Sequence, residues 1–309
     1  MNEKNECYLV IDTGGTAIKY AWMSLDAEII DKGEIPTPKT GLEEYLSALD
    51  GILELRKRTV SGVALSYPGT VDNKKGYIYS GGSLNDFVHN INIRNVLQER
   101  WGLPVQVEKD CNCAALAETW RGNLQGCKNS ITLVMGTGIG CAVICNNSII
   151  RGSHSCAGEL STVLISEDEK EDESYLFKRC GNIGLKEMAA DFLGGRADDW
   201  DGRRIFQLAN DGREKAKEVI ELFTERMAVM IYNLQQLYDP ERIAIGGGIS
   251  AQPLLFEYLK NSLDRLYGNL RYPFTDDAKA DVVPCRYRND ANLVGALKNY
   301  LELSNGNNG

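Results

Sequence analysis

The chain has 309 residues, a formal net charge of -9, 43% hydrophobic residues and 25% charged residues. This length exceeds that of a typical single domain, so we expect two domains, each with its own core. The acidic balance repels nucleic-acid phosphates, and no apolar run approaches the roughly 18 residues that a membrane span needs. We therefore expect no nucleic-acid partner and no membrane segment. Because residues 1–6 lack the apolar core of a signal peptide, we expect a cytoplasmic protein.

The cysteines indicate reduced thiols. There are nine of them, and several, such as Cys7 and Cys141, lie inside apolar runs where a thiol acts as a small hydrophobic group. Cys111 and Cys113 form a Cys-x-Cys pair, but no second pair follows at zinc-finger spacing and the sequence has only 2 histidines. We expect free thiols and no zinc at this pair.

Residues 8–22 predict a β-hairpin, because an apolar run stops at Asp12 and an alternating run resumes after the motif Asp12-Thr-Gly-Gly-Thr16. Gly14 and Gly15 are expected to supply positive φ values and to leave backbone N–H groups open to an anion, with the Thr16 hydroxyl as a further donor. Asp12 would hold a hydrated Mg²⁺ beside that anion. The stretch indicates a metal-nucleotide site, and an ordinary Gly-Gly hairpin with a capping Asp is the alternative.

The chain after this hairpin predicts a third strand at 28–36, which closes a meander, and then a helix at 42–57. Residues 60–65 form a short apolar strand that ends at the stretch 66–72, where a Pro-Gly pair marks a loop. Loops at strand ends are where ligands bind. Residues 81–85 form another flexible polar stretch.

A helix at 92–101 and a strand at 104–108 lead to Lys109 and Asp110, and a second helix follows at 112–120. Asp110 thus stands where a strand gives way to a helix. It is either the N-cap of that helix, accepting a hydrogen bond from the first N–H groups, or a functional carboxylate at a strand end. The position alone does not distinguish the two.

The opening pattern recurs over residues 131–144, where two apolar strands flank a turn at Gly136, Thr137 and Gly138. This repeat indicates a duplicated domain. The Walker loop and the Rossmann fingerprint both need a helix after their glycines, whereas each of these two turns leads into a strand. Both of those nucleotide-binding motifs are therefore excluded.

A third glycine cluster, Gly246, Gly247 and Gly248, runs from a strand into a helix predicted at 253–267, whose first residue is a proline. The glycines and the helix N-terminus could hold an adenosine. The remaining predictions are a solvated acidic loop at 166–174, a long helix at 213–238 and a last helix at 290–303.

Five motifs occur in order along nearly the whole chain: Asp12-Thr-Gly-Gly-Thr16 with Lys19, Glu108-Lys-Asp-Cys-Asn112, Gly136-Thr-Gly-Ile-Gly140, Ala157-Gly-Glu159 and Asp239-Pro-Glu-Arg-Ile-Ala-Ile-Gly-Gly-Gly248. With them the chain resembles the ROK family of sugar kinases and repressors, and within it the bacterial β-glucoside kinases. The resemblance implies the α/β actin-like ATPase fold, in which two ribonuclease-H-like domains flank a nucleotide and sugar cleft. It implies an N-terminal lobe at 1–118, with the helix 290–303 packing back on it, and a C-terminal lobe at 119–289. A homodimer is expected by the same analogy.

The resemblance also implies a role for each motif in transferring a phosphoryl group from ATP to a sugar hydroxyl. Asp110 matches the family's general base, which takes the hydroxyl proton while positioning and Mg²⁺ do most of the rest. Asp12 falls near the Mg²⁺. The residues that match the family's sugar contacts are Gly69, Asn85, Glu159 and Glu187. The residues expected around ATP are Gly14, Gly15, Thr16, Lys19, Gly136, Thr137, Gly138, Gly246, Gly247 and Gly248.

Two departures from the family pattern bear on substrate and metal. The family commonly has Asn before the base, contacting sugar hydroxyls, whereas this chain has Lys109, a cation that cannot accept a hydrogen bond. We expect Lys109 to affect the choice of sugar. The family's zinc-ligand positions fall on Thr162, Lys178, Cys180 and Leu185, so a single cysteine remains, which cannot build a tetrahedral site. We expect no structural zinc.

The leading interpretation is an ATP- and Mg²⁺-dependent kinase of a hexose or a β-glucoside. A non-catalytic, sugar-responsive regulator is the alternative, because the family includes repressors. Those repressors carry a DNA-binding helix-turn-helix ahead of the first phosphate hairpin, and we expect no room for one before Tyr8. An ATPase of the actin or chaperone type would not need the sugar matches at Glu159 and Glu187.

Overall fold

The computed structural model describes residues 6–55, 58–82, 87–166, 174–272 and 275–306. Contacts divide the chain into two compact units. The first unit comprises Met1–Trp120, Arg151–Cys156 and Asp290–Gly309, and the second comprises Arg121–Ile150 and Ala157–Asn289. The short segment Arg151–Cys156 therefore groups with the first unit although the sequence on either side of it belongs to the second.

The first unit is built on a five-stranded sheet with the order β3-β2-β1-β4-β8. Its first three strands in the chain run antiparallel, and β1, β4 and β8 run parallel. This arrangement confirms the predicted hairpin and third strand. The strands are β1 (Glu6–Thr13), β2 (Ala17–Met23), β3 (Ile29–Pro36), β4 (Thr59–Tyr67) and β8 (Val105–Lys109).

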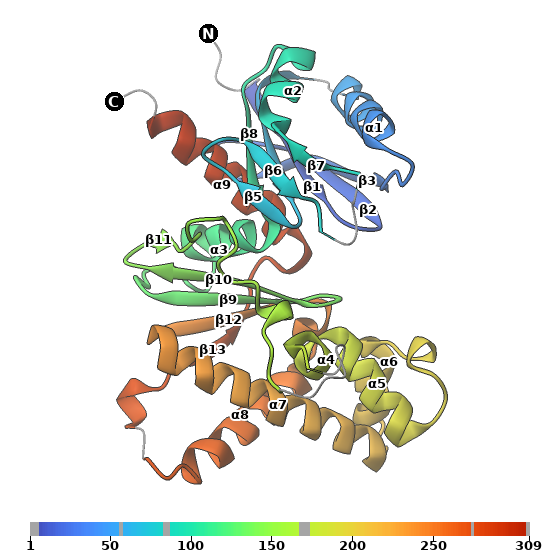
Figure 1. The fold of residues 1–309 in the computed structure, drawn as a ribbon, viewed down its shortest axis with the longest axis vertical. Coiled ribbons are helices and arrows are strands. Elements are labelled where there is room, and N and C mark those ends of the chain that lie inside the picture. The colour runs from blue at the N-terminus through green and yellow to red at the C-terminus, as the bar shows by residue number, and fades with distance from the viewer. Residues whose placement is uncertain (1–5, 56–57, 83–86, 167–173, 273–274, 307–309) are drawn as a thin grey trace. The chain divides into compact units, whose positions relative to one another are not determined.

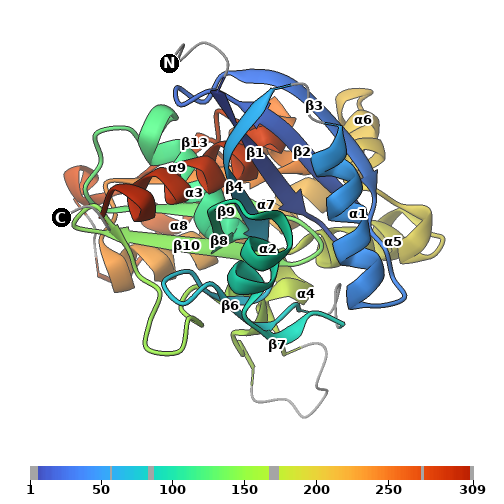
Figure 2. The same ribbon diagram turned by 90° about the horizontal axis from the view of Figure 1, so that it is seen from above.

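Side chains alternate between the two faces of this sheet. Leu9 and Ile11 are fully buried in a core that also contains residues of helices α1 (Leu42–Glu54) and α2 (Ile93–Trp101). On the opposite face lies the C-terminal helix α9 (Ala291–Gly306), which contacts β1, β4 and β8. Figures 1 and 2 both show α9, in red, lying along this sheet. The predicted helices at 42–57, 92–101 and 290–303 are confirmed, with small shifts at their ends.

Helix α3 (Asp110–Arg121) follows β8 without an intervening loop, so it begins at Asp110 and not at the predicted residue 112. It crosses α9 at very short range. A Cβ added to Gly295 of α9 would lie 1.6 Å from the carbonyl oxygen of Cys113, so only glycine allows this approach. The crossing fixes the start of α3 against the C-terminal helix.

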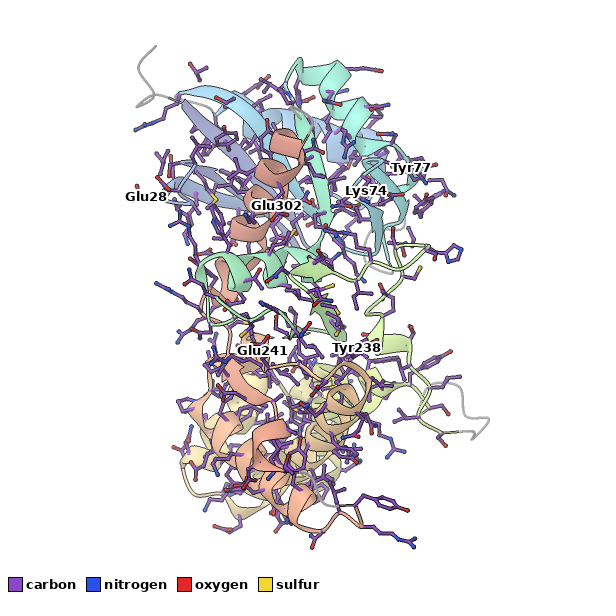
Figure 3. The ribbon with its side chains drawn as sticks, turned by 90° about the vertical axis from the view of Figure 1, so that its left-hand side faces the viewer. Glu28, Lys74, Tyr77, Tyr238, Glu241 and Glu302 are labelled. Atoms are coloured by element: carbon purple, nitrogen blue, oxygen red, sulfur yellow. The ribbon has the colours of Figure 1, made fainter. Side chains whose placement is uncertain are left out.

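A small three-stranded antiparallel sheet, not predicted from the sequence, follows β4. Its strands are β5 (Thr70–Asp72), β6 (Tyr77–Ser80) and β7 (His89–Ile91). The stretch 66–72, predicted as a loop, therefore contains the end of β4 and the whole of β5. Strands this short carry too few residues for a period of two to stand out. Lys74 and Tyr77, labelled in Figure 3, mark the turn between β5 and β6.

The second unit repeats the architecture of the first. Its five-stranded sheet has the order β11-β10-β9-β12-β13, with β9, β10 and β11 antiparallel and β9, β12 and β13 parallel. The predicted second hairpin and the duplication are confirmed. The strands are β9 (Ser130–Met135), β10 (Ile139–Cys145), β11 (Ser148–Ile149), β12 (Arg242–Gly247) and β13 (Asp281–Pro284).

Helices cover the core side of this second sheet. Ile131, Leu133 and Met135 of β9 share one buried core with Phe223 and Met227 of the long helix α7 (Glu214–Tyr238). Helices α7 and α8 were predicted, and Pro253 opens α8 as expected. Figure 3 labels Tyr238, the last residue of α7, and Glu241, which directly precedes β12. The helices are α4 (Leu176–Cys180), α5 (Asn182–Leu193), α6 (Gly202–Asn210), α7 (Glu214–Tyr238) and α8 (Pro253–Gly268), with 3₁₀ turns at Leu160–Thr162, Ala197–Asp199, Gly248–Ala251, Asp276–Ala278 and Arg288–Asp290.

Two predictions from the sequence fall wholly or mostly outside the described residues. They are Asn85 and the acidic loop at 166–174. Among the helices that the structure describes, none combines the length and apolarity that crossing a membrane requires.

Candidate active site

A row of polar side chains crosses the carboxyl ends of the three parallel strands of the first unit. Asp12 of β1 is in register with Ser66 of β4, and Ser66 is in register with Glu108 of β8. Residues in register on parallel strands point to the same face, and the carboxyl ends of parallel strands are where α/β proteins bind ligands. All three residues are buried, with exposed fractions of 8%, 0% and 0%.

Asp12 is held through one of its two oxygens. The Ser66 hydroxyl donates to Asp12 Oδ1 at 2.7 Å, and Asn292 Nδ2 of α9 donates to the same oxygen at 3.0 Å. Burial raises the pKa of Asp12, while these two hydrogen bonds and the positive charge of Lys19 lower it. Lys19 is the residue of β2 in register with Asp12 of β1. Neither Ser66 nor Asn292 donates to the other oxygen, Oδ2.

This carboxylate fits a hydrated Mg²⁺, which takes one or two protein carboxylates and otherwise keeps water and phosphate oxygens. A cation at Asp12 would also offset the burial of its charge. No cluster of three or more His, Cys, Asp and Glu side chains suited to a metal ion occurs in the described part of the chain. The ion would therefore depend on nucleotide phosphates as well as on Asp12.

The first glycine turn differs from its prediction. Gly14 and Gly15 are not among the described glycines with left-handed φ values, so the expectation of positive φ at these positions is wrong. Gly14 is required for space, because its N–H donates to the Ala17 carbonyl at 3.0 Å and an added Cβ would lie 2.9 Å from that oxygen. Thr37 stabilises the turn with two hydrogen bonds: its hydroxyl donates to the Gly14 carbonyl oxygen, and its backbone N–H donates to the Thr16 carbonyl oxygen.

Asp110 is the first residue of α3, directly beyond the end of β8. Its side chain is partly exposed, and Oδ1 accepts the backbone N–H of Cys111 at 2.7 Å. Lys109, the residue before it, is 5% exposed and in register with Tyr67. The predicted base and the predicted specificity residue are therefore adjacent at one strand-to-helix junction.

The buried thiol of Cys113 shows how many acidic groups meet at this junction. Burial raises its pKa well above the ordinary value, and the charges of Glu108, Asp12 and Asp110 raise it further, while a hydrogen bond to Ser66 lowers it. Asp12 and Glu108 therefore belong to one row across β1, β4 and β8, and Asp110 begins the helix that follows β8 directly.

Gly69, predicted as a sugar contact, has a φ of 88° in the loop between β4 and β5. A Cβ there would lie 2.1 Å from the Ser80 carbonyl oxygen and 2.7 Å from the N of Gly82. Glycine is thus required both for the backbone conformation and for the close approach to the Gly81-Gly82 stretch. The second predicted contact of this region, Asn85, lies outside the described residues.

The two glycine clusters of the second unit come together at the carboxyl ends of β9 and β12. Gly247 is in register with Met135, which directly precedes Gly136. Gly247 has a φ of 91°, and an added Cβ would lie 2.1 Å from the Met135 carbonyl oxygen. A Cβ on Gly136 or Gly248 would meet no atom of the described chain within 4 Å, so backbone at both positions is open to a ligand.

The loop that carries Glu159 is tied to the second hairpin. Ser161 Oγ accepts the N–H of Ile139 at 2.7 Å and would lie 2.4 Å from a Cβ added to Gly138. Glu159 is partly exposed and precedes the 3₁₀ turn Leu160–Thr162. Thr137 is exposed at the tip of the same hairpin. These predicted sugar and nucleotide residues are therefore neighbours.

Glu187 of α5 forms an ion pair with Lys178 of α4, with 2.6 Å between Oε1 and Nζ. Lys178, Cys180 and Leu185 stand where the resemblance predicts zinc ligands, and Cys180 and Leu185 are buried in the core of the second unit. A Cβ on Gly181 would lie 3.3 Å from the Thr137 carbonyl oxygen, so the α4–α5 junction also borders the second hairpin.

Comparison with known proteins shows the family of this chain. The model of the ROK family matches residues 8–301. The chain belongs to the ROK family. A β-glucoside kinase of Klebsiella pneumoniae is 30% identical over 294 residues, which cover 94% of this chain and 95% of that protein. A glucokinase of Halalkalibacterium halodurans is 30% identical over 272 residues, covering 79% of this chain and 80% of that protein.

Solved structures of the family share the fold. A ROK family protein of Streptococcus pneumoniae, solved in complex with sucrose, has a TM-score of 0.85 and 32% identity, with 97% of this chain and 99% of that chain covered. This ROK chain therefore has the actin-like ATPase fold, as the resemblance implied.

Ser66 and Asn292, which hold Asp12, belong to none of the predicted motifs.

Proposed function

We propose that this protein is an ATP-dependent kinase that phosphorylates a hydroxyl of a hexose or a β-glucoside, with Asp110 as the general base. The observation that carries the proposal is the position of two carboxylates at the carboxyl ends of parallel strands: Asp12 is buried at the end of β1, and Asp110 directly follows β8. The names of the relatives, β-glucoside kinase and glucokinase, support the same reaction.

The transfer needs a proton acceptor beside the sugar hydroxyl, because the oxygen that attacks the γ-phosphorus must lose its proton. Asp110 takes that proton, the new bond joins the sugar oxygen to phosphorus, and ADP leaves with the electrons of the broken phosphorus–oxygen bond. A Mg²⁺ ion bound with the nucleotide would be held by Asp12 and would supply positive charge for the phosphate oxygens. Ser66 and Asn292 keep the Asp12 carboxylate in one orientation.

The remaining predicted residues divide between the two ligands. The hairpin with Gly14, Gly15, Thr16 and Lys19 and the second-unit glycines would surround ATP, and Gly69, Lys109, Glu159 and Glu187 would contact the sugar. We further propose that the lobes predicted at 1–118 with 290–303 and at 119–289 are the functional halves, and that the protein forms a homodimer.

A coupled assay of ADP release tests the activity with glucose, fructose, N-acetylmannosamine, gentiobiose and cellobiose, each with MgATP. The kinase proposal predicts sugar-dependent ADP release and a phosphorylated product with at least one of them. The alternative, a sugar-responsive regulator without catalysis, predicts calorimetric sugar binding with no ADP release above the sugar-free rate. That result would overturn the proposal.

A further inference from the structure

Glu108 is fully buried in β8, two residues before the proposed base, and four donors converge on its carboxylate. Oε1 accepts the backbone N–H of Lys109 at 2.8 Å and Asn112 Nδ2 at 2.9 Å. Oε2 accepts Arg151 Nε at 3.1 Å and Nη2 at 2.5 Å. A buried carboxylate is costly unless it is paired and hydrogen-bonded, and both of its oxygens are satisfied here.

The two donors on Oε1 bracket Asp110. Lys109 precedes the base and Asn112 follows it in the first turn of α3. One carboxylate oxygen thus holds the chain on both sides of the residue that must face the sugar hydroxyl. Rotation of the Glu108 carboxylate would break both of these hydrogen bonds.

Arg151 opposes that rotation, because its Nε and Nη2 both donate to the other oxygen of Glu108. Its side chain is 26% exposed, and it opens the segment Arg151–Cys156, which groups with the first unit. The chain enters this segment from β11 and leaves it towards Ala157-Gly-Glu159. Gly152 and Ser155, with φ values of 73° and 58°, let the segment turn sharply on the way.

We propose that Arg151 is a positioning residue for catalysis: acting through Glu108, it fixes the strand-to-helix junction that presents Asp110, and it does so from the segment leading to Glu159. This inference rests on the proposed function, since it assigns Asp110 a base's role. None of the five predicted motifs contains Arg151. A purely structural role for the ion pair would change only the stability of the fold.

The experiment compares wild type with Arg151→Met, Arg151→Lys and a matched control, Arg100→Met. Arg100 also pairs with a carboxylate in the first unit, with 2.6 Å between its Nη2 and Asp50 Oδ2, and its side chain is 35% exposed. For each protein, kcat, the KM values for sugar and ATP, and Tm are measured, with activity assayed well below the lowest Tm. Arg151→Met is expected to lower kcat about 10- to 100-fold, because small misplacements of a catalytic group have effects of this size.

The KM for ATP should change less than kcat. Arg151→Lys, which keeps the charge but offers a different donor geometry, should recover part of the lost kcat. Arg100→Met should lower Tm and leave kcat within about twofold of wild type, a margin well below the expected effect at Arg151. If the kcat of Arg151→Met stays within about twofold of wild type, the inference is overturned. It is also overturned if kcat falls in proportion to the decrease in Tm in all three variants.

If Arg151→Met does not fold, Arg151→Lys decides alone: a reduced kcat at an unchanged Tm supports the inference, and wild-type kcat overturns it. Failure of the proposed function looks different. In that case wild type shows no sugar-dependent transfer, or Asp110→Asn keeps its activity. If wild type is active and Asp110→Asn is not, normal turnover by the Arg151 variants removes this inference only.

Discussion

Asn292 Nδ2 lies 3.0 Å from Asp12 Oδ1, so a residue of the C-terminal helix holds a carboxylate 280 positions earlier in the chain. Ser66 donates to the same oxygen. The Asn292 amide and the Ser66 hydroxyl thus orient the Asp12 carboxylate, and neither of them bonds its second oxygen, Oδ2. In the proposed function, Asp12 held in this way would bind the Mg²⁺ that accompanies ATP.

Replacing Asn292 by Leu should weaken binding of MgATP more than it weakens the fold. A hydrogen bond to a charged group contributes about 1.5–3 kcal/mol, so the Kd for a non-hydrolysable ATP analogue with Mg²⁺ should rise roughly 10- to 100-fold. Calorimetric titration measures this. Asn299→Leu is the control, because Asn299 bonds Asn73 and the Val107 carbonyl from the same helix. It should lower Tm without changing the Kd, and equal Kd values for wild type and Asn292→Leu would contradict the role of Asn292.

Asp12→Asn should stabilise the ligand-free protein at neutral pH while abolishing transfer. Burial raises the pKa of Asp12, so the folded state favours the protonated carboxyl, and this contribution is lost as the pH rises through the raised pKa. An amide in its place keeps the oxygen that accepts from Ser66 and Asn292 and carries no buried charge. Thermal melts should give a higher Tm for the variant at pH 7.5, and the difference should shrink as the pH falls towards the ordinary range of Asp.

Asp50→Asn is a control in the same unit, because the pKa of Asp50 is shifted in the direction opposite to that of Asp12. The hydrogen bonds from Arg100, and a further one from Trp101, lower the pKa of Asp50, so its charge adds stability that is lost as the pH falls through the lowered pKa. This variant should have a lower Tm than wild type at pH 7.5. If Asp12→Asn also melted lower than wild type there, burial of the Asp12 charge would not destabilise the fold as argued.

Lys109→Asn should change the order of sugars by kcat/KM more than it changes kcat on the best sugar. Lys109 is buried next to the proposed base and offers only hydrogen-bond donors, where the resemblance to the family predicts an amide. A site that lacks an acceptor for one hydroxyl discriminates differently among sugars. Steady-state kinetics on the five sugars measure this. A uniform fall in kcat with an unchanged order would show that Lys109 serves the transfer itself.

The protein purified without chelator should contain well below one zinc per chain. The resemblance to the family predicts metal ligands at Lys178 and Leu185 and a sugar contact at Glu187. In the structure Lys178 pairs with Glu187, and Leu185 is buried. An ammonium cannot bind a metal ion, and one cysteine does not build a tetrahedral site. Elemental analysis tests this directly, and a Tm unchanged by EDTA should accompany it. Stoichiometric zinc would contradict the prediction.

Local patterns in the sequence predicted much of the fold. Each glycine turn between two apolar runs marks a hairpin, and its recurrence after residue 131 revealed the duplicated architecture. Asp110 was placed correctly at a strand-to-helix junction, because its neighbours change period there. Gly14 was identified as necessary for the wrong reason, since it is needed for space and not for a positive φ.

Residues that act over long sequence separations could not be found in this way. Asn292 and Arg151 are ordinary polar residues in their local sequence, and their roles arise only when the fold places them against Asp12 and Glu108. The short strand β5 was missed because three residues show no period. The helices at 176–210 were also not predicted. Their core-facing residues, such as Phe206, pack against partners that only the tertiary structure supplies.

The central claim is that Asp110 takes the proton from a sugar hydroxyl, and the kcat of Asp110→Asn on the best sugar tests it most directly. The amide keeps the size of the side chain but cannot accept the proton, and general-base catalysis contributes roughly 10²- to 10⁴-fold in rate. The account predicts a folded protein, with wild-type circular dichroism and nearly unchanged sugar affinity, whose kcat is lower by at least about 100-fold. A folded variant that keeps more than about a tenth of wild-type kcat would contradict the account.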